Sequence, residues 1–208
     1  VGLGLASSGF DFVGDTVLAT GSENTGGGSA LYQFWRDDGA TQGPPILASA
    51  DTGRVDTVFI EPIALERAGE PVFLVFEREF LVPMATHLVT DAGTLEQDIV
   101  DSPGIKPPYI PASSGTSALV YSTLDATLLG IDISQATPVW TAWPSEAARA
   151  RVVSTYHDPG DGMFYAVLDD GSVHRASQAS GWTDWSEFDL AITTASELDA
   201  TVRSLGKM

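Results

Sequence analysis

Five tryptophans offer the clearest ligand-binding chemistry in this chain, because an aromatic face can stack on the apolar C–H surface of a sugar ring. They are Trp35, Trp140, Trp143, Trp182 and Trp185. A tryptophan that recurs at equivalent strand positions more often packs between neighbouring sheets, and we expect this for Trp140 and Trp182. Trp35, followed by Arg36, stands outside that repeat. We therefore predict that Trp35 and Arg36 contact a ligand.

The three histidines predict no metal site, because their spacing would not place them together on one face of an element. His157 directly precedes Asp158, and we expect both to line a polar ligand site. His87 and His174 each stand three residues before a recurring Ser or Thr, which indicates a structural role. The sequence contains no nucleophile elbow, phosphate-binding loop or calcium loop. We expect no cofactor and no metal.

A small hydrophobic residue followed by Ser or Thr recurs after extended apolar runs, with spacings of 41, 44 and 43 residues. Such a period indicates stacked copies of one supersecondary unit. Short strands rich in Val, Ile, Phe, Tyr and Thr alternate with turns rich in Gly, Pro and Asp. The recurring steps are Ala48-Ser49, Val89-Thr90, Ile133-Ser134 and Ala176-Ser177.

Three to four strands in a unit of about 45 residues match the blade of a β-propeller. We predict an all-β propeller with four full blades and a partial fifth, in one domain spanning residues 1–208. Each unit is expected to open on one extended stretch, followed by an apolar run ahead of the recurring step. The predicted blades are residues 13–53, 54–103, 104–149 and 150–196, with terminal strands at 1–12 and 197–208. The expected opening stretches are Asp15–Leu18, Asp56–Phe59, Pro108–Ile110, Val152–Tyr156 and Ala200–Arg203.

The two terminal segments predict a fifth blade that has its inner and outer strands but lacks its middle. This pattern suggests that the chain belongs to a larger polypeptide or propeller. A four-bladed ring whose ends clasp each other is the alternative. The start at Val1 and the absence of a visible signal peptide suggest a processed product. No apolar run approaches the roughly 20 residues that span a bilayer, so we expect no membrane insertion.

The composition is strongly acidic, with 28 Asp and Glu against 10 Lys and Arg and a formal net charge of −18. Nucleic acid is excluded as a partner, because phosphate binding requires a basic surface. The acidic residues are scattered through turns, which is typical of a solvated, soluble surface. Adaptation to high salt is the alternative explanation. The absence of Cys leaves the compartment open, and we favour an extracellular or cell-surface location.

The last two units carry a family resemblance. Asp158-Pro159-Gly160-Asp161-Gly162-Met163-Phe164-Tyr165, then Gly171–Ser177, then Gly181-Trp182-Thr183-Asp184-Trp185, resembles a blade of sugar-active or sugar-binding propellers. Two groups match this succession: the five-bladed furanosidase-type glycoside hydrolases and the tectonin-like lectins. Trp140-Thr141-Ala142-Trp143 repeats the last part of the pattern 42 residues earlier. The first two units lack it.

The hydrolase resemblance implies acidic residues at the inner strands, because glycoside hydrolysis uses two carboxyl groups. The matching positions are Glu61 before Pro62 and Asp158 before Pro159, with Asp15 or Asp11 as a third. An acidic residue before proline is commonly a turn former, which is the reading we favour here.

We therefore predict a non-catalytic recognition module that binds a glycan or a protein, with Trp35, Arg36, His157 and Asp158 as ligand contacts. A glycoside hydrolase is the alternative, and a structural domain of a larger assembly is the third possibility.

Overall fold

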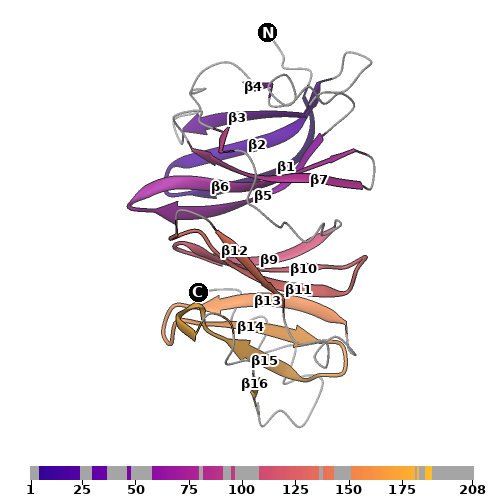
Figure 1. Cartoon of the computed structure of the whole chain (residues 1–208), viewed down its shortest axis with the longest axis vertical. Coiled ribbons are helices and arrows are strands. Elements are labelled where there is room, and N and C mark those ends of the chain that lie inside the picture. The colour runs from indigo at the N-terminus through magenta and orange to yellow at the C-terminus, as the bar shows by residue number, and fades with distance from the viewer. Residues whose placement is uncertain are drawn as a thin grey trace. The chain divides into compact units, whose positions relative to one another are not determined.

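The computed structural model describes two compact units, which we treat separately. The first unit is Val1–Pro107 with Ile133–Val139, and the second is Pro108–Asp132 with Trp140–Met208. In the part of the chain that is described, each unit contains two four-stranded antiparallel sheets (Figure 1). The described residues are 5–23, 30–36, 46–47, 58–79, 82–90, 95–96, 108–135, 138–142, 151–180, 182 and 186–188.

The first unit holds the first and second sheets, and in both the strands lie side by side in chain order. Ala68 and Gly69, between β5 and β6, both have positive φ, of 55° and 83°. Positive φ at both central residues is the requirement of the two-residue type I′ hairpin turn. The first sheet contains β1 (Leu5–Val13), β2 (Thr16–Glu23), β3 (Ala30–Arg36) and β4 (Ile46–Leu47), and the second contains β5 (Val58–Arg67), β6 (Glu70–Glu79), β7 (Val82–Thr90) and β8 (Leu95–Glu96).

Most of the described buried apolar residues of the first unit lie in its second sheet. Every residue from Val72 to Glu77 in β6 is buried, so this central strand is covered on both faces. The Asp11 carboxylate on β1 accepts a 2.7 Å hydrogen bond from the backbone N–H of Ala64 on β5. This bond ties the first sheet to the second. Glu77 and His87 are both fully buried, and their side chains meet at 2.9 Å.

The second unit holds the third and fourth sheets, whose strands also follow one another in chain order. The Thr155 hydroxyl on β13 donates to the Ile110 carbonyl on β9 at 3.2 Å, which joins the two sheets. The third sheet contains β9 (Tyr109–Ser114), β10 (Ser117–Ser122), β11 (Thr127–Asp132) and β12 (Val139–Ala142). The fourth contains β13 (Val152–Asp158), β14 (Met163–Leu168), β15 (Val173–Ala176) and β16 (Ser186–Phe188), with the 3-10 turn η2 (Gln178–Ser180) after β15.

The core of the second unit is an apolar cluster contributed by both of its sheets. Phe164 stands at its centre and packs against Trp182, with ring centroids 5.0 Å apart. Trp182 is 3% exposed, whereas Trp140 is only partly buried. The expected burial is therefore confirmed for Trp182. The cluster contains Leu119, Tyr121, Leu128, Val152, Phe164, Ala166, Leu168, Ala176 and Trp182.

The recurring Ser/Thr step marks the end of a third strand in three sheets. Thr90 ends β7, Ser134 follows β11 by two residues, and Ser177 directly follows β15. Ser49 lies outside the described residues. The prediction that these steps fall in separate sheets is confirmed for the three positions that are described.

The first sheet differs from the predicted repeat by one strand. Asp15 lies in the turn between β1 and β2, so the stretch expected to open the first blade forms the second strand instead. The apolar run Leu31–Trp35 accordingly falls in the third strand, β3, and not in the second. Residues 5–12, expected in an outer strand of a fifth blade, pair with β2. Segment 197–208 lies outside the described residues, and the blade boundaries and ring closure stay predictions.

Among the residues that the structure describes, no helix is long and apolar enough to cross a membrane.

Candidate functional site

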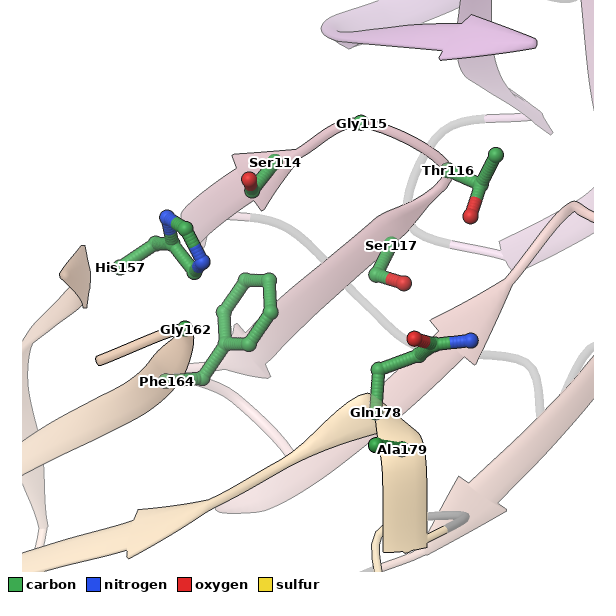
Figure 2. A pocket seen from close by; sticks show the side chains of 9 residues that line it. All are labelled: Ser114, Gly115, Thr116, Ser117, His157, Gly162, Phe164, Gln178 and Ala179. Carbon is green, nitrogen blue, oxygen red and sulfur yellow. The ribbon is translucent and has the colours of Figure 1, made fainter. Parts of the chain in front are cut away.

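A pocket of about 290 Å³ opens within the second unit, where two hairpins and a 3-10 turn meet (Figure 2). The β9–β10 hairpin, the β13–β14 hairpin and η2 each contribute part of its wall. This volume is at the lower end for ligand pockets and suits one small group, not an extended ligand. The lining residues are Ser114, Gly115, Thr116, Ser117, His157, Gly162, Phe164, Gln178 and Ala179.

Tight turns position the two hairpins. Gly115, at φ +52°, and Gly162, at φ +71°, occupy the left-handed region that favours glycine. The Gly162 N–H donates to the Asp158 carbonyl at 2.8 Å. The Asp158 side chain accepts the Gly160 N–H at 2.8 Å, and the Asp161 side chain accepts the Met163 N–H at 2.9 Å. Asp158 is therefore a turn former, in the way that Asp commonly shapes turns.

Asp132, at the end of β11, binds one pocket residue from the β9–β10 turn of its own sheet and one from η2. One carboxylate oxygen accepts the Thr116 hydroxyl at 2.9 Å, and the other accepts the Gln178 side-chain N–H at 2.7 Å. A carboxylate only accepts hydrogen bonds, so the amide nitrogen of Gln178 must face Asp132 and its carbonyl oxygen must face away. Figure 2 shows the Gln178 side chain extending from η2 toward Ser117.

His157 and Phe164 form the other side of the pocket, beside Ser114 (Figure 2). The two rings are 4.6 Å apart between centroids, and Phe164 also contacts Trp182. Phe164 is only 2% exposed, so its ring supplies an apolar floor but no open stacking face.

Partial burial lowers the pKa of His157 below its usual value of 6.5, although Asp158 and Asp161 act in the opposite direction. At pH 7 the imidazole is therefore mainly neutral. A neutral imidazole has one nitrogen that donates and one that accepts a hydrogen bond.

The predicted site residues fall in different parts of the chain. His157 lines the pocket, and Asp158 shapes the hairpin beside it. Trp35 and Arg36 lie on β3, and Glu61 lies on β5; these two strands belong to the first unit. The structure does not describe the side chains of these three residues. Asp15 is exposed in the β1–β2 turn, where it accepts the Thr16 hydroxyl at 3.5 Å.

Several pocket residues did not emerge from the sequence. The segment Ser113-Ser114-Gly115-Thr116-Ser117 has the composition of a turn, and that was its only signal. Gln178 follows the recurring Ala176-Ser177 step, but no sequence pattern indicated a role for Gln178 itself. Among the described residues, no group of three or more His, Asp or Glu is arranged to hold a metal ion.

No protein-family model matches the sequence, and no curated protein matches it. Several solved structures, however, are similar to this chain in fold. A structure of HIRA superposes with a TM-score of 0.52 at 13% identity, over 83% of this chain and 51% of that one. The calcium-binding protein regucalcin from Agrobacterium tumefaciens gives a TM-score of 0.51 at 12% identity, over 87% of this chain and 60% of that one.

Prolyl oligopeptidase B from Galerina marginata, bound to a 35mer substrate, gives a TM-score of 0.51 at 13% identity, over 88% of this chain and 27% of that one. All three of these structures contain β-propellers. The fold is a β-propeller. The chain spans between about a quarter and 60% of the length of these propeller proteins. At such low identity the likeness establishes the fold alone, because one propeller fold carries many functions.

Proposed function

We propose that this chain is a non-catalytic recognition module that binds a partner through the pocket of its second unit. The observation that carries the proposal is the pair of hydrogen bonds from Thr116 and Gln178 to Asp132. These bonds fix polar groups from the β9–β10 turn and from η2 before any ligand arrives. A preorganised site loses less conformational freedom on binding, which favours affinity.

The chemistry of the lining supports recognition over hydrolysis. Among the described lining residues, the polar groups are hydroxyls, an amide and an imidazole, and none is a carboxylate. Glycoside hydrolysis usually employs two carboxyl groups across the scissile bond. Asp158, which the hydrolase resemblance would require, already accepts a hydrogen bond within its own turn.

Protein is the partner that we favour over glycan at this pocket. Sugar-binding sites commonly present an open aromatic face, whereas Phe164 is covered by His157 and Trp182. Trp35 and Arg36 remain proposed contacts on the first unit.

Peptide and glycan arrays probed with the labelled chain would test this proposal, with hydrolysis of the same glycans followed in parallel. We expect bound peptides whose signal falls in Gln178→Ala. The matched control is Gln135→Ala, which removes an exposed glutamine outside the pocket. Circular dichroism would verify that both variants fold. If bound ligands resist Gln178→Ala, the pocket is the wrong site; if nothing binds, a purely structural domain replaces the recognition module.

A further inference from the structure

The pocket is surrounded by negative charge but presents uncharged acceptors at its surface. We propose that it accepts the ammonium group of a lysine side chain, carried by an extended segment of a protein partner. This inference rests on the proposed function and names its ligand. Three observations carry it: the charge around the pocket, the hydrogen-bond acceptors that line it, and the packing of the aromatic rings along one side of it.

Carboxylates stand behind both walls of the pocket. Asp132 lies behind Thr116 and Gln178, and each of its oxygens accepts a hydrogen bond from one of them. Asp158 and Asp161 lie close enough to His157 to influence its charge. No Lys or Arg is found among the described lining residues. Arg175 and Asp161 both act on Tyr165, so the charge of Asp161 is partly balanced there. Three nearby carboxylates, with no Lys or Arg among the described lining residues, still favour a cation over an anion.

The acceptors at the surface suit an ammonium group. The Gln178 carbonyl oxygen is directed away from Asp132, and the hydroxyls of Ser114 and Ser117 can accept from a bound donor. His157 is mainly neutral at pH 7, so one of its nitrogens can accept as well and the ring does not repel a cation. A lysine ammonium has three diverging donors, which match acceptors spread around a pocket.

The same arrangement favours lysine over arginine. A guanidinium is recognised best by a carboxylate facing its planar fork or by an open aromatic ring. Here the carboxylate of Asp132 is occupied by two protein donors, and Phe164 is buried beside the rings of His157 and Trp182. A volume of about 290 Å³ holds the end of one side chain. The remainder of the partner would lie outside the pocket.

The acidic surface of the whole chain acts in the same direction. With 28 acidic and 10 basic side chains, the net charge of −18 attracts a basic segment at long range. Such steering raises association rates and weakens as salt is added. The pocket would then select lysine at short range from the basic segments that the field brings to the surface.

The experiment compares short peptides, capped at both ends, that have one central residue flanked by glycines. Lysine, arginine, norleucine and N-acetyl-lysine are placed in turn at the centre, and binding to the full chain is measured by calorimetry at low and moderate salt. We expect the lysine peptide to bind about tenfold more tightly than the acetyl-lysine peptide, because acetylation removes the charge but keeps most of the length.

Two single variants test whether the lysine peptide binds in this pocket. Asp132→Asn should weaken lysine binding about tenfold, whereas Asp170→Asn, which removes an equal charge from an exposed turn, should leave it within about twofold. Because Asp132→Asn could disturb folding, nuclear magnetic resonance of the wild-type chain provides a second measurement. The side-chain amide signals of Gln178 should shift with the lysine peptide and not with acetyl-lysine.

The outcomes separate this inference from the proposed function. Equal binding of lysine and acetyl-lysine peptides, or a preference for arginine, would overturn the lysine site and leave a protein-recognition module. Glycans as the only array ligands that depend on Gln178 would also overturn it and leave recognition intact. If no array ligand depends on Gln178, both the recognition site and its lysine specificity fail.

Discussion

The indole ring of Trp182 occupies the space in which a side chain at Gly130 would begin. Trp182 reaches this position from a backbone φ of +64°, unusual for a residue with a side chain, and its backbone N–H donates to the Ser177 carbonyl at 3.1 Å. Gly130 lies on β11 of the third sheet, while Trp182 follows the third strand of the fourth. The absence of a side chain at residue 130 is therefore what allows the ring to close the core between the two sheets.

Gly130→Ala should destabilise the chain by about 1–3 kcal/mol, because the added methyl overpacks the indole. Chemical denaturation would measure this loss. Gly160→Ala is the control, since the atoms nearest to its methyl group would be those of the half-buried Asp158 carboxylate, at 3.1 Å. In a Trp182→Ala background the same Gly130→Ala change should cost little, giving a coupling free energy of about 0.5–3 kcal/mol. Additive effects of the two changes would contradict the contact.

Trp182→Ala should cost about 3–5 kcal/mol in unfolding free energy, as expected for a large buried aromatic side chain. Trp140→Ala should cost clearly less, because Trp140 is only partly buried. Urea unfolding of both variants beside the wild type would rank them. Equal losses would show that Trp140 is as deeply packed as Trp182.

The buried pair of Glu77 and His87 should be sensitive to the loss of either partner. Glu77→Leu leaves His87 without its 2.9 Å partner in the core of the first unit, and the expected cost is about 1–3 kcal/mol. The double variant Glu77→Leu with His87→Leu should recover part of this loss, since both polar groups are then removed. A double-mutant cycle by thermal denaturation measures the recovery. A double variant no more stable than Glu77→Leu would argue against direct coupling.

His157 should introduce a pH dependence into folding and binding. Its pKa in the folded chain lies below the unfolded value of about 6.5, so the unfolded state takes up the proton first as pH falls. The stabilising contribution is thus present above about pH 6.5 and is lost as pH falls toward the folded pKa. Nuclear magnetic resonance titration of the imidazole should give a midpoint below 6.5.

The His157→Gln variant is the control for this titration. Its urea midpoint should change less than that of the wild type between pH 7.5 and 5. Lysine-peptide binding should also weaken over this range in the wild type, because a protonated imidazole repels the ammonium. A His157 midpoint above 6.5 would show that Asp158 and Asp161 outweigh burial.

Arabino- and fructofuranosides should not be hydrolysed by this chain. The Asp158 carboxylate accepts a hydrogen bond within its own turn, and no carboxylate is among the described pocket-lining residues. Incubation with chromogenic furanosides would check this expectation. Activity that disappears in both Glu61→Gln and Asp158→Asn would establish the hydrolase instead.

The sequence was sufficient to predict the propeller but not its strand register. Periodic steps at Thr90, Ser134 and Ser177 predicted repeated units of three to four strands, because a spacing near 43 residues persists whatever the details of pairing. The run Leu31–Trp35 misled the assignment of the first sheet. An apolar strand has the same composition in the second or third place, and only its partners decide between them.

The pocket could be predicted only in part, for a related physical reason. His157 was identifiable because an imidazole beside a carboxylate is chemically distinctive. Thr116 and Gln178 are ordinary polar residues far apart in sequence. They are brought together in one pocket because both donate hydrogen bonds to Asp132. Such a site depends on the packing of two sheets, which no local pattern records.

Each sheet in the described chain is assembled from strands that are consecutive in sequence. This arrangement has a consequence for synthesis on the ribosome. A sheet needs no segment that has yet to be translated, so its hairpins can close while the next sheet is still inside the exit tunnel. Contacts between sheets form only after later residues emerge. Examples are the hydrogen bond from Ala64 to Asp11 and the packing of the Trp182 ring against Gly130.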